Sequence, residues 1–149
     1  MKGEHFMERT TSKREQTEER NKANVRQVYK EIFNQGKTEL VREFFSEKYI
    51  QHKPILDNGI QAVVDFIQEK MERTPKPSIN IKHILAEGDF VVVHSHITIN
   101  PSDERSGQAV VDLFKLENGL IVEHWDVIQD IPATTVNGNS MFSDLYKAG

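Results

Sequence analysis

The stretch AVVDLFKLENGLIVEHWDVIQ, residues 109–129, decides the fold. Runs rich in Val, Ile and aromatic residues lie on either side of Asn118-Gly119, and this dipeptide between such runs is a strong signal for a β-hairpin. The stretch therefore predicts two antiparallel strands, over residues 108–117 and 120–131.

Two segments upstream have the same composition, residues 78–86 and 90–100. Polar and glycine-containing breaks at residues 87–89 and 101–107 separate them from each other and from the hairpin. Four strands in hairpin succession predict an antiparallel meander.

The first half of the chain repeats its apolar residues with a helical period. A first stripe ends near Gly36, which is suited to end a helix, and a short second helix is expected over residues 38–45. Residues 46–54 are expected to be extended, and a third helix follows them. The first stripe contains Val25, Val28, Tyr29, Ile32 and Phe33, and the third helix contains Ile60, Val63, Val64, Ile67 and Met71. Helices followed by a meander predict an α+β fold, with the helices on one face of a curved sheet.

The length of 149 residues predicts one domain. Residues 1–21 are polar and highly charged, so burial cannot compensate for the entropy of ordering them. We expect a flexible tail there, or at most a helical extension. The domain proper is expected at residues 22–142, and residues 143–149 are expected to form a C-terminal tail.

The composition excludes several classes of partner. With 19 Lys+Arg against 23 Asp+Glu the net charge is −4, which disfavours nucleic acid. No apolar stretch is long enough to span a membrane. The chain has no cysteine, hence no disulfide and no thiol nucleophile. We therefore expect a soluble, cytoplasmic protein whose partner is a small molecule.

The most informative polar residues are Asp112, His124 and Asp126, which we call the polar cluster. His124 and Asp126 share one face of the last strand because side chains alternate along a strand. A two-residue loop at Asn118-Gly119 places Asp112 opposite Trp125, whereas a three-residue loop places it opposite His124. The second alternative matches apolar residues better across the hairpin, and it makes the polar cluster one island on an apolar face.

Such a cluster is costly to bury unless its members are paired, so it is more often a site than an accident. A buried carboxylate can act as a general base, and a His–Asp pair can hold a proton or polarise a carbonyl. The alternatives are that this face is solvated or that Asp and His form a structural pair.

A second group of histidines lies at His94 and His96, which share one face of their strand. A two-residue loop between the first two meander strands places His83 opposite His94. These histidines are expected to line the pocket, or to lie on an outer or subunit face, or to bind a metal together with His124.

Tyr49, Gln51 and His52 lie in the extended segment before Pro54. Alternation puts Tyr49 and Gln51 on one face and His52 on the other. Phe114 shares a face with Asp112. We expect Tyr49, His52 and Phe114 among the residues that bind the substrate, besides His94 and His96.

With these residues in view, the chain resembles the SnoaL-like polyketide cyclase family of the NTF2-like superfamily, in the subgroup labelled aldol condensation-catalysing enzymes. The resemblance covers residues 22–142. The stretches that carry it are NVRQVYKEIFNQG, YIQHKP, AEGDFVVVHSH, AVVDLFKLENGLIVEHWDVIQ and NGNSMF. It implies an α+β cone, with a curved sheet and helices around a pocket.

The resemblance also implies acid/base chemistry α to a carbonyl, without cofactor or metal. The position that matches the family's pocket aspartate is Asp126, the expected general base, assisted by His124 and Asp112. His94 and His96 would orient the carbonyl. The superfamily also contains isomerases, dehydratases, epoxide hydrolases and non-catalytic binders, so a small-molecule-binding module is the alternative, and a metal-dependent enzyme using His94, His96 and His124 is a weaker one.

The last strand carries apolar groups on both faces, including Val122 on one and Trp125 on the other. A sheet that is apolar on both faces must be covered on both. Helices and pocket cover one face, so we expect a homodimer in which a second subunit covers the outer face.

Overall fold

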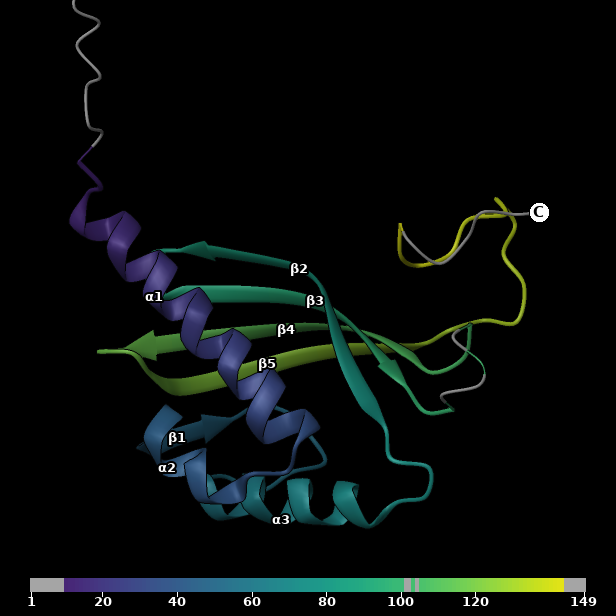
Figure 1. Cartoon of the computed structure of the whole chain (residues 1–149), viewed down its shortest axis with the longest axis horizontal. Coiled ribbons are helices and arrows are strands. Elements are labelled where there is room, and N and C mark those ends of the chain that lie inside the picture. The colour runs from purple at the N-terminus through teal and green to yellow at the C-terminus, as the bar shows by residue number, and fades with distance from the viewer. Residues whose placement is uncertain (1–9, 101–102, 104, 144–149) are drawn as a thin grey trace, which may run out of the picture.

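The computed structural model describes residues 10–100, 103 and 105–143, and its largest element is a twisted five-stranded sheet (Figure 1). Strands β2 to β5 form the antiparallel meander, which is confirmed. β1 adds to β5 in the parallel direction at one edge, so the sheet is mixed, in the order β1-β5-β4-β3-β2. The bounds are β1 Phe45–Gln51, β2 Ser78–Glu87, β3 Phe90–Thr98, β4 Gln108–Glu117 and β5 Leu120–Asp130.

Helices lie against one face of this sheet, which we call the inner face (Figure 1). Helix α1, Lys13–Gln27, continues directly into a π-helical segment, η1, Val28–Asn34, and crosses β2 and β3. A 3₁₀ turn, η2, Thr38–Leu40, and helix α2, Val41–Phe44, lead into β1, and helix α3, Ile60–Glu72, packs beside β1. None of the described helices is long and apolar enough to cross a membrane.

The apolar core lies between these helices and the inner face. The two predicted helical stripes supply much of it, since Val28, Ile32 and Ile67 are fully buried. From the sheet, Val91 and Val93 of β3 meet them, also fully buried. The predicted α+β arrangement is therefore confirmed.

The beginning of α1 corrects the expectation of a flexible tail up to residue 21. The helix starts at Lys13, behind a capping box in which the Glu15 amide donates to Ser12 Oγ at 3.2 Å. The Ser12 amide in turn donates to the Glu15 carboxylate at 2.7 Å. From residue 13 onward the helical extension is thus the correct alternative, while residues 1–9, and residues 144–149 of the expected C-terminal tail, lie outside the described part.

Polar contacts dock α1 onto the turns of the sheet. The Gly88 amide in the β2–β3 turn donates to the Glu18 carboxylate at 2.7 Å. The Asn24 amide donates to the Gly119 carbonyl in the β4–β5 turn at 2.9 Å. Because these contacts are polar, an apolar pattern could not reveal that the segment would be ordered.

The β4–β5 hairpin has neither of the two expected registers. Asn118 and Gly119 both have positive φ, 49° and 83°, and form a two-residue turn. Val122 is then an extra residue in β5, a β-bulge, which shifts the pairing so that Asp112 lies opposite Asp126. The bulge restores the alternation that puts the whole polar cluster on the inner face.

The β2–β3 hairpin has the expected register near its turn. His83 lies opposite His94, and Leu85 lies opposite Val92. A bulge at Lys82 shifts the pairing farther from the turn.

Candidate active site

A cavity of about 270 Å³ lies between α3 and the inner face of the sheet. Of the residues expected at a site, all three of the polar cluster line this cavity, and so do Tyr49 and Phe114. The rest of the wall is mostly apolar, with side chains such as Phe66 and Ile97. The expected combination of an apolar cavity with a few ionisable groups is therefore present.

Asp112 of β4 is the centre of a hydrogen-bond network. Its Oδ1 lies 2.7 Å from Nε2 of His124, and the side chains are only 13% and 10% exposed. The phenol of Tyr29, from η1, donates to Oδ2. Both carboxylate oxygens of Asp112 are thus engaged by protein groups.

Gln51 of β1 fixes the tautomer of His124. The Lys53 amide donates to Gln51 Oε1 at 3.0 Å, so this amide atom is an acceptor. The same oxygen lies 2.8 Å from Nδ1 of His124, and Nδ1 must therefore carry a proton. One further proton lies between Nε2 of His124 and Oδ1 of Asp112. The pair is then either a neutral histidine beside a carboxylic acid or an imidazolium beside a carboxylate. The pair can hold one exchangeable proton in the cavity wall.

Two tyrosines next to the cluster remain protonated. Burial, and then the charge of Asp112, raise the pKa of Tyr29 well above its ordinary value. The same two causes, with Asp126 in addition, raise the pKa of Tyr49. Tyr49 accepts a hydrogen bond from the Gln51 amide at 2.8 Å, and its own proton can be donated into the cavity.

Asp126 of β5 forms an ion pair with Lys53, whose ammonium lies 2.5 Å from Oδ2. The two side chains are 8% and 11% exposed. The other oxygen, Oδ1, has no hydrogen-bond partner among the described residues. Asp126 is therefore the carboxylate of the cluster that keeps an oxygen for a ligand.

Neither Lys53 nor Tyr29 was expected at the site. Alternation along the extended segment already put Lys53 on the same face as Tyr49 and Gln51, so a signal for it existed. No such signal existed in the sequence for Tyr29, because a tyrosine within an apolar helical stripe is expected to be a core residue.

The polar cluster has the composition of a cation site, and one ligand atom from each of its residues lies within 4.8 Å of the others. Two of these residues already have donors from the protein, Lys53 on Asp126 and Tyr29 on Asp112. A divalent cation would compete with the Lys53 ammonium for Asp126.

His52 does not line the cavity, which corrects its expected role in substrate binding. Its ring stacks on Trp125 with centroids 4.8 Å apart, and its Nε2 lies 2.7 Å from the Glu123 carboxylate. The alternation that brings Tyr49 and Gln51 to the cavity turns His52 to the outer face of the sheet.

His94 and His96 are also on the outer face, because their neighbour Ser95 points into the cavity. Both rings contact Phe142 of the C-terminal segment, with centroids 5.2 and 4.6 Å apart. The expected roles in orienting a carbonyl, and a metal site shared with His124, are therefore wrong, since the sheet separates these side chains.

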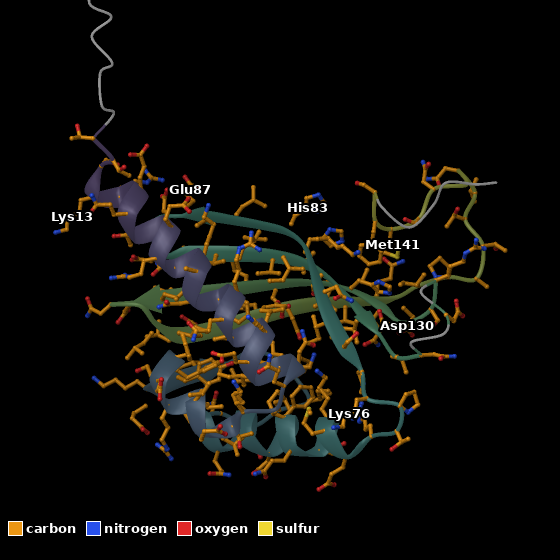
Figure 2. All side chains as sticks on the ribbon, in the orientation of Figure 1. Lys13, Lys76, His83, Glu87, Asp130 and Met141 are labelled. Atoms are coloured by element: carbon orange, nitrogen blue, oxygen red, sulfur yellow. The ribbon has the colours of Figure 1, made fainter. Side chains whose placement is uncertain are left out.

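His83 of β2 belongs to the same outer group, because its imidazole ring contacts that of His94. Their Nδ1 atoms lie 3.1 Å apart. Burial, followed by the charges of His83 and Lys82, lowers the pKa of His94. Figure 2 shows Met141 of the C-terminal segment near His83, and both line a second hollow of about 330 Å³.

Comparisons with known proteins agree on the fold. The sequence matches the family described as SnoaL-like polyketide cyclase over residues 23–135. The curated proteins include no match. Among solved structures, a candidate SnoaL-like polyketide cyclase from Jannaschia sp. CCS1 is similar, with 20% identity, a TM-score of 0.62, and coverage of 79% of this chain and 91% of that chain.

Two similar structures carry names of other activities. A candidate ketosteroid isomerase from Kribbella flavida has 16% identity and a TM-score of 0.63, and the match covers 79% of this chain and 84% of that one. An LEH-like epoxide hydrolase from M. tuberculosis has 13% identity and a TM-score of 0.59, with coverage of 75% and 84%. At such identities the likeness shows a shared fold and leaves the reaction open.

Proposed function

The chain belongs to the SnoaL-like polyketide cyclase family, with the NTF2-like fold, and from this premise we propose a cofactor-independent enzyme that acts α to a carbonyl group. The substrate is a small or mid-sized organic compound, and the reaction is an aldol-type condensation or an isomerisation. The observation that carries the proposal is the convergence of Asp112, His124 and Asp126 in one largely apolar cavity.

Asp126 acts as the general base in this proposal. Its free Oδ1 takes the proton from the carbon next to the carbonyl, which leaves an enolate. Tyr49 donates a hydrogen bond to the carbonyl oxygen, where negative charge develops. The enolate then attacks a second carbonyl, or it is reprotonated at another carbon.

His124 and Asp112 support this chemistry without touching the base directly. Their shared proton allows the pair to protonate an oxygen anion at the cavity wall, or to take the proton back. The Tyr29 hydrogen bond holds Asp112 in place for this role.

One observation favours a second candidate, a non-catalytic module that binds a small molecule. The Lys53 ammonium already holds Oδ2 of Asp126 in an ion pair, which is an arrangement that a purely structural carboxylate would also have. In that case the cavity would bind ketones without exchanging their protons.

Deuterium exchange separates the two candidates. A panel of aryl and alkyl ketones is incubated in D₂O with the full chain, and loss of the α-proton signal is followed by NMR. We expect exchange with at least one ketone that binds in the cavity. Binding without any exchange above the buffer rate would favour the binding module.

We also propose that the protein is a homodimer through the outer face of β4 and β5. Val111 and Val127 lie opposite each other there and are 44% and 74% exposed. Exposed apolar side chains in a contiguous patch mark interaction surfaces.

A further inference from the structure

Lys70 of α3 is a charged side chain in the cavity that the proposed reaction does not use. The residue is only 5% exposed, and it lines the same cavity as the polar cluster. Its ammonium donates to the main-chain carbonyl of Phe33, near the end of η1. Within the described part of the chain, no carboxylate forms an ion pair with it.

A buried cation without an anionic partner is unusual. Taking a charge out of water is costly unless an opposite charge or several hydrogen bonds compensate for it. An ammonium has three N–H donors, and the Phe33 carbonyl accepts from one of them. The feature that would complete this environment is an anionic acceptor inside the cavity.

Arg73 adds a second positive charge to the same wall. It also lines the cavity, and it lies close enough to Lys70 to affect its titration. Burial first, and then Arg73, lower the pKa of Lys70 to about 8, so that the ammonium is still charged at neutral pH. Glu69 pairs with Arg73 at 3.0 Å, on the exposed side of the helix.

We propose that the substrate carries a carboxylate in addition to its carbonyl, and that Lys70 binds this carboxylate while the carbonyl lies at Tyr49 and Asp126. The position of the carbonyl rests on the proposed function. The position of the carboxylate rests on Lys70 and its surroundings.

The charges in the cavity favour a single carboxylate. Lys53 balances Asp126, and the His124 and Tyr29 donors satisfy Asp112. Lys70 then remains as one uncompensated positive charge. A phosphate carries about two negative charges at neutral pH and would exceed this requirement.

A matched pair of aryl ketones tests the proposal. The first is 4-oxo-4-phenylbutanoate, and the second is its methyl ester, which has the same skeleton without the charge. Dissociation constants are measured by NMR titration of the full chain. We expect the wild type to bind the acid about tenfold or more tightly than the ester.

Variants then assign the preference to Lys70. In Lys70→Met the acid should lose its advantage, while Lys70→Arg should keep part of it. The control is Lys76→Met, which changes the net charge equally at an exposed residue in the loop between α3 and β2 (Figure 2). Thermal melts of each variant show that it is folded.

Three results would overturn the proposal. One is a wild type that binds the ester at least as tightly as the acid. Another is a folded Lys70→Met variant that keeps the full preference for the acid. The third is a wild type with no measurable affinity for the acid. The first and third results are obtained with the wild type alone, so they do not depend on whether a variant folds.

Deuterium exchange into the same two compounds separates this proposal from the proposed function. Exchange into both at equal rates, with equal affinities, would refute the carboxylate site and leave the enzyme assignment intact. Tighter binding of the acid without exchange into either compound would support the carboxylate site and count against the enzyme assignment.

Discussion

Asp112 and His124 are joined by a hydrogen bond of 2.7 Å although they do not lie opposite each other in the sheet. Asp112 lies opposite Asp126, and His124 lies opposite Phe114. The contact is therefore diagonal, and it brings all three members of the polar cluster to one point on the inner face. The bulge at Val122 creates this arrangement, because without it the alternation in β5 would turn His124 away.

Replacing the proposed base should remove activity and keep the fold. We expect Asp126→Asn to lower the rate of α-proton exchange by about 10²–10⁴-fold, because an amide cannot take the proton. The rate is measured by NMR with the best ketone of the panel. Asp65→Asn, at an exposed residue of α3, is the matched control and should exchange at the wild-type rate. An Asp126→Asn variant with exchange close to the wild-type rate would show that the base lies elsewhere.

Removing the Tyr29 hydroxyl should destabilise the protein. In Tyr29→Phe the buried Asp112 carboxylate loses a donor, and an unsatisfied buried acceptor costs about 1–3 kcal/mol of unfolding free energy. Urea unfolding measures this difference, and exchange should fall less than in Asp126→Asn. An unfolding free energy equal to that of the wild type would mean that the hydrogen bond contributes nothing to stability.

Alternation along strands could predict which residues of the site share a face. It put His124 and Asp126 on one face of the last strand, put Tyr49 and Gln51 on one face of the extended segment and separated His52 from both. It could not predict the register of β4 and β5, because Asn118-Gly119 fixes the turn but does not show the extra residue Val122.

Other features of the site depend on contacts between distant parts of the chain. Tyr29 and Asp112 are 83 residues apart in the sequence, and Lys53 and Asp126 are 73 residues apart, yet each pair is hydrogen-bonded. Alternation put His94 and His96 on one face of their strand, but it could not show whether that face is the inner or the outer one. The inner face proved to be the apolar one, since it faces the helices and the core.

The outer face should hold two subunits together. Light scattering should give about twice the monomer mass of 17.2 kDa. Val127→Lys should produce a monomer, because a charge replaces an exposed apolar group on the face proposed for the contact. Val136→Lys, at a fully exposed valine outside the sheet, is the control and should remain a dimer. A wild-type protein with the monomer mass would refute the dimer.

The affinity for the aryl keto acid should depend on pH through Lys70. The pKa of Lys70 is about 8, lowered by burial and by the neighbouring Arg73, so the ammonium is charged below this pH and loses its proton above it. A carboxylate binds the charged form, and affinity should therefore fall as the pH rises through about 8. The bound carboxylate favours the ammonium in turn, so the pKa of Lys70 should be higher in the complex than in the free protein. Titrations at about pH 6.5 and about pH 9.5 should differ by about tenfold for the acid and should agree for the methyl ester. If the acid bound with the same affinity at both pH values, Lys70 would not be the residue that binds the carboxylate of the acid.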